Sequence, residues 1–328
     1  AGAYNPTATE VFEEGIRLPV LRLIEHGTVR EDLWKLLLLN TRTPHLLEGD
    51  LRAMLGSTRI GMERVALLVE ELGITEAFSY FSGVLDHADR SFRREIAKLP
   101  DGVYEAEDRS DNDCFETRDV TVRVKLTIEG DALAIDFSGS DSQILGFKNS
   151  SLSNTYSAVY TALASFLDPH LPHNEGAFRC IKLVAPIGTV VNAKEGASTT
   201  MCTVFFAHEI IHAVWKALSI ADPPRACAGW AKNVFGISVG KEESEAPYVF
   251  YHGAAAAGSG AVHGRDGFNQ IGHVCTLGGL TMPNVEAYEQ LYPVQFHRQE
   301  FRTDGAGAGE WRGGSGCDYE VEMYTPAT

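Results

Sequence analysis

The sequence lacks an excess of positive charge and any long apolar run, and each absence excludes a class of protein. Its 28 Lys and Arg residues stand against 44 Asp and Glu, which gives a formal net charge of −16. This balance argues against nucleic acids and anionic membrane surfaces as partners, because both attract basic patches. No apolar stretch approaches the ~20 residues that a membrane-spanning helix needs. We therefore expect neither a nucleic-acid-binding nor a membrane protein.

Paired cysteine motifs are missing as well. Six cysteines occur in 328 residues, and none are spaced as CxxC. Such spacing indicates buried thiols in a reducing compartment and not a disulfide framework or a zinc knuckle. The chain opens without the basic and apolar regions of a signal peptide, so we expect a cytoplasmic protein. It also opens without Met and stops just after a strand-like run, so we expect a processed or partial chain.

No nucleotide-binding motif is present. The sequence contains no GxxxxGK[ST] loop, and Gly258-Ser259-Gly260 is not a dinucleotide fingerprint because His263 occupies the place of its third glycine. Ser138-Gly139-Ser140 ends a predicted strand and does not open a helix, which excludes a nucleophile elbow. We therefore assign no bound cofactor to this chain.

Glycine, by contrast, is abundant in the last third, from Gly253 to Gly316. It is concentrated in GAAAAGSGAVHGRDG (253–267) and LYPVQFHRQEFRTDGAGAGEWRGGSG (291–316). Glycine carries an entropic cost and is used where φ must be positive or where backbones approach closely. We predict an irregular, backbone-lined surface, of the kind that holds a substrate or a partner subunit.

The hydrophobic pattern changes period near residue 100. Apolar residues three and four apart predict helices over 32–40 and 48–72 and a third helix that ends near Pro100. Alternation over 119–141 then predicts a β-hairpin that turns at 129–131. Helices at 154–167 and 203–218 and short strands between glycine loops follow. We predict an α+β chain: a mainly helical region over 1–100, then a β-rich core over 101–328 with two helices. Mixed sheets in a barrel-like arrangement and polyproline II-like Gly-rich segments are part of this prediction.

The sharpest local motif is HExxH, from His208 to His212. On a helix the two histidines share a face and can bind zinc, with Glu209 as general base. His208, however, falls within the apolar stripe of the predicted helix, and no acidic ligand follows in the next nine residues. Packed or subunit-contact histidines are therefore favoured, and we assign no metal ligand.

A second candidate follows the glycine loop, in His263-Gly264-Arg265-Asp266-Gly267. The arginine can bind a carboxylate or phosphate through two hydrogen bonds. Equally, Arg265 and Asp266 can form a structural pair that pins the loop, and the two interpretations stay open. The residues that we predict to carry chemistry are His263, Arg265, Asp266, His273 and Cys275.

Taken together and in order, six motifs resemble the hydantoinase B/oxoprolinase family. They are TATEVFEEGIRLP (7–19), GDLRAMLGSTRIG (49–61), IDFSGSD (135–141), LDPHLPHNEGAFR (167–179), GRDG (264–267) and EWRGGSG (310–316). The resemblance implies the B-type, non-kinase subunit of a hetero-oligomer. ATP is then bound by a kinase-like partner of the hydantoinase A or acetone carboxylase β type, which phosphorylates the substrate.

The chain departs from the family pattern at two places. The family's metal-binding His and Asp residues lie upstream of the EEG motif, where this chain has not yet begun, so a divalent metal would be held by upstream residues. Hydantoinase-type members also carry a polar Asn-x-Glu-Thr stretch where this chain has the apolar 202–206, CTVFF. That stretch is more similar to the acetone and acetophenone carboxylase branch.

The resemblance thus leaves three functions open. An apolar wall at 202–206 suits a ketone better than a polar ring, which favours ATP-dependent ketone carboxylation. The alternative is ATP-dependent hydrolysis of a cyclic amide such as a hydantoin, 5-oxoproline or a lactam. The third is a scaffold whose Gly-rich surface docks the kinase subunit.

Overall fold

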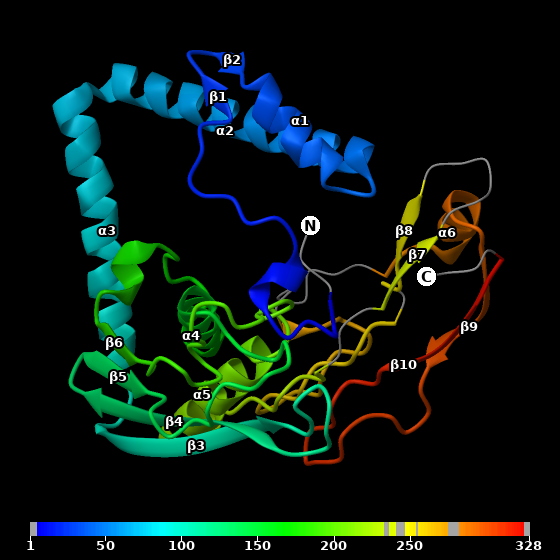
Figure 1. Cartoon of the computed structure of the whole chain (residues 1–328). Coiled ribbons are helices and arrows are strands. Elements are labelled where there is room, and N and C mark those ends of the chain that lie inside the picture. The colour runs from blue at the N-terminus through cyan, green and yellow to red at the C-terminus, as the bar shows by residue number, and fades with distance from the viewer. Residues whose placement is uncertain (1–4, 233–235, 241–246, 254, 275–281, 325–328) are drawn as a thin grey trace. The chain divides into compact units, whose positions relative to one another are not determined.

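The computed structural model describes residues 5–232, 236–240, 247–253, 255–274 and 282–324 (Figure 1). The chain divides into two compact units. The first, here the core unit, comprises Ala1–Gly15, Leu85–Gly236 and Tyr251–Glu322. The second, here the helical unit, comprises Ile16–Val84, Ile237–Phe250 and Met323–Thr328.

The helical unit contains the helices expected near the N-terminus. A small hairpin, β1 (Ile24–Glu25) and β2 (Thr28–Val29), precedes α1 (Glu31–Leu39) and the long α2 (Pro44–Leu72). Gly73, with φ of 82°, ends α2, and α3 (Ile74–Ile96) begins at the next residue and runs into the core unit. Strands β7 (Ile237–Gly240) and β8 (Tyr248–Tyr251) form a separate pair. The predicted helices are confirmed, although no side chain of α2 is buried.

A four-stranded sheet forms the base of the core unit. Its strands are β3 (Gly102–Ser110), β4 (Val120–Glu129), β5 (Ala132–Asp136) and β6 (Ile181–Val184), in the order β3-β4-β5-β6. The first two pairings are antiparallel and β5 pairs with β6 in parallel. The alternation on β4 predicted the buried face correctly, because Val122, Val124, Leu126 and Ile128 are all buried. The hairpin is confirmed, whereas β3 was not predicted.

One helix covers the inner face of this sheet, and a second helix packs on the first. Helix α4 (Leu152–Phe166) packs on α5 (Ala207–Ala221), and α5 packs on β3 and β4 (Figure 1). Twelve of the fifteen residues of α5 are buried, so it is the central element of the hydrophobic core. Three single turns of 3₁₀ helix complete this part: η1 (Val11–Glu14), η2 (Glu175–Phe178) and η3 (Pro223–Arg225).

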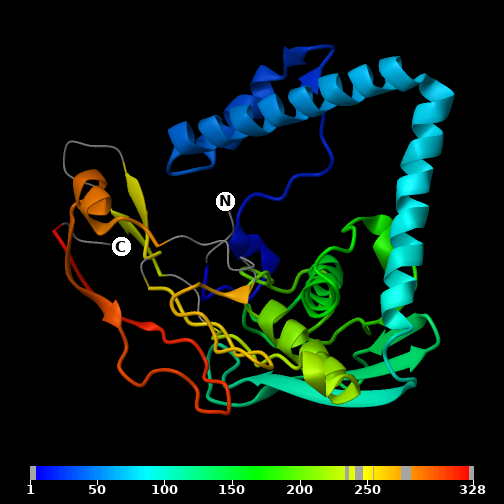
Figure 2. The ribbon, with the colours of Figure 1, turned by 180° about the vertical axis from the view of Figure 1, so that it is seen from behind.

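The Gly-rich region of the core unit is built from extended segments whose backbones lie against one another (Figure 2). Ser259 N donates to Phe268 O at 2.9 Å, and Gly314 N donates to Ser259 O at 2.8 Å. A Cβ on Gly314 would lie 1.9 Å from Phe268 O, so no larger residue fits there. Close backbone approach, one of the two reasons given for these glycines from the sequence, is confirmed at Gly314.

The region also holds a short helix that the sequence did not predict, α6 (Val285–Leu291), and the paired strands β9 (Val294–Phe301) and β10 (Cys317–Met323). The fold is therefore α+β, as predicted. Within the described residues no sheet closes on itself, and the barrel-like arrangement stays a prediction. So does a domain boundary near residue 100. Over the same residues, every helix is too short or too polar to cross a bilayer.

Candidate functional site

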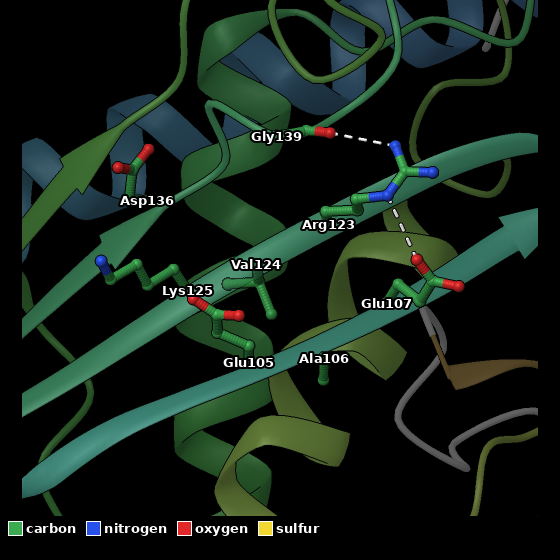
Figure 3. A pocket seen from close by; sticks show the side chains of 8 residues that line it. All are labelled: Glu105, Ala106, Glu107, Arg123, Val124, Lys125, Asp136 and Gly139. Carbon is green, nitrogen blue, oxygen red and sulfur yellow. Dashed lines mark hydrogen bonds and ion pairs between the residues drawn. The ribbon is translucent and has the colours of Figure 1, made fainter.

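One pocket lies on the outer face of the sheet and has an ordinary structural explanation. It has a volume of about 420 Å³ and is lined by charged side chains of β3, β4 and β5 (Figure 3). Glu107 stands directly opposite Arg123, whose Nε donates to the carboxylate at 3.2 Å. Lys125 likewise stands between Glu105 and Asp136 on its two neighbouring strands. Opposite charges in cross-strand pairs stabilise sheets, so we assign this pocket no chemistry.

The inner face of the sheet carries a buried ion network around Asp108 of β3. Lys216 Nζ donates to Asp108 Oδ1 at 2.8 Å, and His212 Nδ1 lies 3.4 Å from Oδ2, which Lys232 Nζ also contacts. Burial alone would raise the pKa of Asp108. The neighbouring His212, Lys216 and Lys232 outweigh burial and hold that pKa well below its usual range. Asp108 is therefore ionised and ties β3 to α5.

The HExxH motif is used to build this network. His212 Nε2 accepts the backbone N–H of Trp230 at 3.1 Å, so the hydrogen bonds assign its proton to Nδ1, which faces Asp108. Glu209 Oε2 accepts the backbone N–H of Phe206 at 2.8 Å and so caps α5. Neither ring nitrogen of His212 is left for zinc. No group of three or more His, Cys, Asp or Glu side chains in the described part of the chain is placed to hold a metal ion.

His208 and His273 pack together in the same core. The His208 ring is stacked on His212 at 6.0 Å between centroids and meets His273 edge-on at 5.6 Å. Burial, assisted by the neighbouring His212 and His273, lowers the pKa of His208 to about 3. Burial also lowers the pKa of His273. Neither nitrogen of His208 has a hydrogen-bond partner among the described residues, so His208 is a neutral, packed histidine.

The exposed loop at 262–267 lies elsewhere in the core unit. Val262 and Arg265 exchange backbone hydrogen bonds of 3.1 and 3.0 Å around Gly264, whose φ is 84°. The Arg265 guanidinium lies 4.8 Å from the Phe268 ring centroid, and Asp266 Oδ1 accepts the backbone N–H of Arg312 at 2.7 Å. Asp266 thus pins the WRGG turn and, among the described contacts, forms no ion pair with Arg265. Of the two interpretations left open for this loop, the structural Arg265–Asp266 pair is therefore not observed.

The five predicted site residues therefore do not form one constellation. His263, Arg265 and Asp266 share an exposed loop, and His273 lies in the buried histidine cluster. Cys275 lies outside the described residues. Their catalytic roles stay predictions.

Beside α5 the loop borders a larger pocket, about 680 Å³ in volume. The His263 and Trp311 rings meet edge-on at 4.5 Å, and Lys216 of α5 lines the same pocket. Burial raises the pKa of the Cys227 thiol to about 12, so this thiol is not a nucleophile at neutral pH. Much of the remaining lining is apolar: Ala106, Ile220, Ala226, Ala228, Ala261 and Val262. The other polar lining residues are Glu105, Glu107, Ser219 and Glu310. A largely apolar pocket with a few polar groups is the usual form of a small-molecule site.

Sequence reasoning missed Lys216 and Trp311 in this pocket. Lys216 is the one charged residue in the C-terminal half of α5, where the other residues are apolar apart from Ser219. A single charge in that apolar half was a usable signal. No comparable signal in the sequence marked Trp311, because its place in the pocket depends on the hydrogen bonds that hold the Gly-rich turn.

The chain is similar in sequence to several known proteins. The family described as hydantoinase B/oxoprolinase matches residues 1–328. The caprolactamase beta subunit from Pseudomonas jessenii is 33% identical over 97% of this chain and 55% of its own length. A putative D-/L-hydantoinase subunit from Pseudomonas sp. (strain NS671) is 28% identical over 96% of this chain and 54% of its own. The chain thus spans about half the length of the curated relatives it matches.

Two solved structures share the fold. The crystal structure of the ATP-dependent caprolactamase from Pseudomonas jessenii superposes with a TM-score of 0.90 at 33% identity, over 98% of this chain and 56% of that chain. A nucleotide-free acetone carboxylase superposes with a TM-score of 0.85 at 20% identity, over 97% and 45%. At that identity the acetone carboxylase likeness shows the fold alone.

Proposed function

The chain belongs to the hydantoinase B/oxoprolinase family, and we propose that it forms part of a B-type subunit of a multisubunit, ATP-dependent enzyme that hydrolyses cyclic amides. The observation that carries this proposal is the 33% identity to the caprolactamase beta subunit over 97% of the chain. The hydantoinase subunit is a second relative whose name refers to a cyclic amide. We therefore propose cyclic-amide hydrolysis, the alternative drawn from the sequence, ahead of the ketone carboxylation that the sequence favoured.

The apolar stretch 202–206, which favoured a ketone, gives that interpretation little support. Val204 and Phe206 are buried, and Phe206 belongs to the hydrophobic core. Phe205 does line a pocket, but Arg109 and Lys148 are among its other lining residues. Carboxylation remains the second candidate on the family resemblance alone.

We propose the apolar pocket beside α5 as the place where the amide ring binds. A lactam combines apolar methylenes with a single polar amide, which suits a pocket whose lining is mainly apolar. His263 and Lys216 are the polar lining residues to which we assign a role, and the others are Glu105, Glu107, Ser219 and Glu310. Imidazole exchanges protons readily near neutral pH, so we assign to His263 a proton transfer at the amide nitrogen. Lys216, fixed by its hydrogen bond to Asp108, would present its positive charge to the amide oxygen.

ATP is proposed to bind a kinase-like partner subunit, because this sequence has no recognisable nucleotide phosphate loop. The partner would transfer the γ-phosphoryl group of ATP to the amide oxygen and release ADP. The subunit that contains this chain would hold the activated ring while water adds to its carbonyl carbon, the ring C–N bond breaks and inorganic phosphate leaves. Any divalent metal of the complete enzyme is proposed to be held outside the described residues.

The test uses the complete enzyme with its partner subunit and ATP. It is offered ε-caprolactam, hydantoin and 5-oxoproline and, separately, acetone with ¹⁴C-bicarbonate. We expect one ring-opened amino acid that accumulates with ATP consumption, and no fixed label. Label fixed into a ketone without ring opening would replace hydrolysis by carboxylation.

His263→Ala separates a site from a scaffold. We expect turnover to fall ~100-fold, as for loss of a proton-transfer group, while the complex still elutes intact from gel filtration. His170→Ala, at an equally exposed histidine outside the pocket, is the matched control. Dissociation of the complex in His263→Ala alone would favour the docking scaffold.

A further inference from the structure

A second pocket of the core unit is not used by the proposed function. It has a volume of about 420 Å³ and lies where β3 ends and α5 begins. Three cationic and two acidic side chains line it. The complete lining is Arg109, Ser110, Asp111, Asn112, Lys148, Phe205, Glu209 and Lys232.

Lys148 is the unusual member of this lining. It is only 6% exposed, and its Nζ donates to Ser110 Oγ at 2.9 Å and to Asn112 Oδ1 at 2.6 Å. Its ammonium also lies 5.2 Å from the Phe205 ring centroid. All these partners are neutral, and no carboxylate of the described residues lies within ion-pair distance of Nζ. Buried lysines are rare unless an opposite charge accompanies them.

The other two cations around the pocket already have acidic partners. Lys232 contacts Asp108, lies 3.6 Å from Glu209 Oε1 and donates to Arg109 O at 2.8 Å. Arg109 Nη1 donates to Asp119 Oδ2 at 2.7 Å. Among the described residues that line the pocket, the positive charge that remains without a counterion is therefore that of Lys148.

We propose that this pocket binds a small oxyanion, a carboxylate or inorganic phosphate, whose negative charge pairs with Lys148. A bound oxyanion supplies the counter-charge that the protein does not, and the second N–H of the Asn112 amide can donate a further hydrogen bond, since the first donates to Asp111 Oδ1 at 2.8 Å. Asp111 and Glu209 also line the pocket, so a ligand of low charge fits better than a polyphosphate. The competing explanation is structural: the ammonium ties the 110–112 loop to the segment before α4.

The experiment is calorimetric titration of the full-length protein, without ATP or substrate, so that its outcome is independent of the catalytic proposal. Phosphate and acetate are titrated separately, with chloride at matched ionic strength as the reference. We expect saturable binding of at least one oxyanion at millimolar concentration. Comparing the affinities for phosphate and acetate shows which oxyanion the pocket prefers.

Two substitutions separate the role of the Lys148 charge from the structural role of its hydrogen bonds. Lys148→Met removes the charge and the hydrogen bonds, whereas Lys148→Gln removes the charge but can still bond to Ser110 and Asn112. We expect both to weaken oxyanion binding ~10-fold or more, with Lys148→Gln folded as judged by circular dichroism. Lys182→Met, at an exposed lysine of β6, should bind like wild type. Wild-type affinity in Lys148→Gln, or no binding of either oxyanion beyond chloride by wild type, would overturn the proposal.

Discussion

Replacing Asp108 by Asn tests whether the buried ion network holds α5 on the sheet. The substitution keeps the shape of the side chain but removes the negative charge that His212, Lys216 and Lys232 share. Removing one partner of a buried ion pair typically costs ~3–5 kcal/mol, because the other charge is left uncompensated. The Lys216 side chain is 51% exposed and can be solvated, and Lys232 keeps Glu209 at 3.6 Å. We therefore expect a loss at the lower end of this range, a decrease of about 3 kcal/mol in the free energy of unfolding.

The assay is urea denaturation, with the midpoint and the slope fitted separately. Asp119→Asn is the matched control, because Asp119 forms an ion pair with Arg109 at 2.7 Å but is 53% exposed. Exposed pairs contribute under ~1 kcal/mol. A stability loss in Asp108→Asn no larger than that of Asp119→Asn would refute the reasoning.

The same network gives a signed dependence on pH. The folded-state pKa of Asp108 is lowered, so its contribution to stability is present above the unfolded-state pKa of about 4 and is lost as the pH falls below it. Wild type should therefore lose more stability than Asp108→Asn on acidification from about pH 5 to pH 3. Parallel curves for the two proteins would contradict the lowered pKa.

Three further predictions follow from the histidines and the glycines. His208 has a pKa lowered to about 3, so the unfolded state gains a proton before the folded state does as the pH falls below about 6.5. Wild type therefore loses stability between pH 7.5 and pH 5, and His208→Leu should remove about 2 kcal/mol of that loss, measured by urea denaturation. An unchanged loss would exclude a neutral buried imidazole. Gly314→Ala should lower the melting temperature sharply, because its Cβ would lie 1.9 Å from Phe268 O, whereas Gly307→Ala, which has open space, should not; equal melting temperatures would contradict the close backbone approach. His212→Ala should leave the metal content of the purified protein unchanged by plasma emission spectrometry, since its nitrogens face Trp230 and Asp108; loss of stoichiometric zinc would restore the metalloenzyme interpretation.

Local pattern determined much of the secondary structure from the sequence alone. Alternation over β4 and helical spacing over α2, α4 and α5 survive in the structure because each pattern reflects one face buried by its neighbours. Strand β3 escaped prediction because its outward positions after Val103 are charged and its inward ones include Asp108 and Ser110. These polar residues are buried as partners of α5 and Lys148, which is a property of the tertiary structure and not of the strand.

The sequence by itself determined the family, the α+β class and the reason for the glycines. The motifs and the steric needs of the backbone can be recognised from short stretches of consecutive residues. Only the tertiary structure decided that His273 joins His208 while His263 faces a different pocket, that His212 and Glu209 hold a helix in place, and that Lys148 is buried without a counter-charge among the described residues. Each of these facts depends on contacts between residues far apart in the chain, and residue type and spacing do not encode which distant side chains will meet.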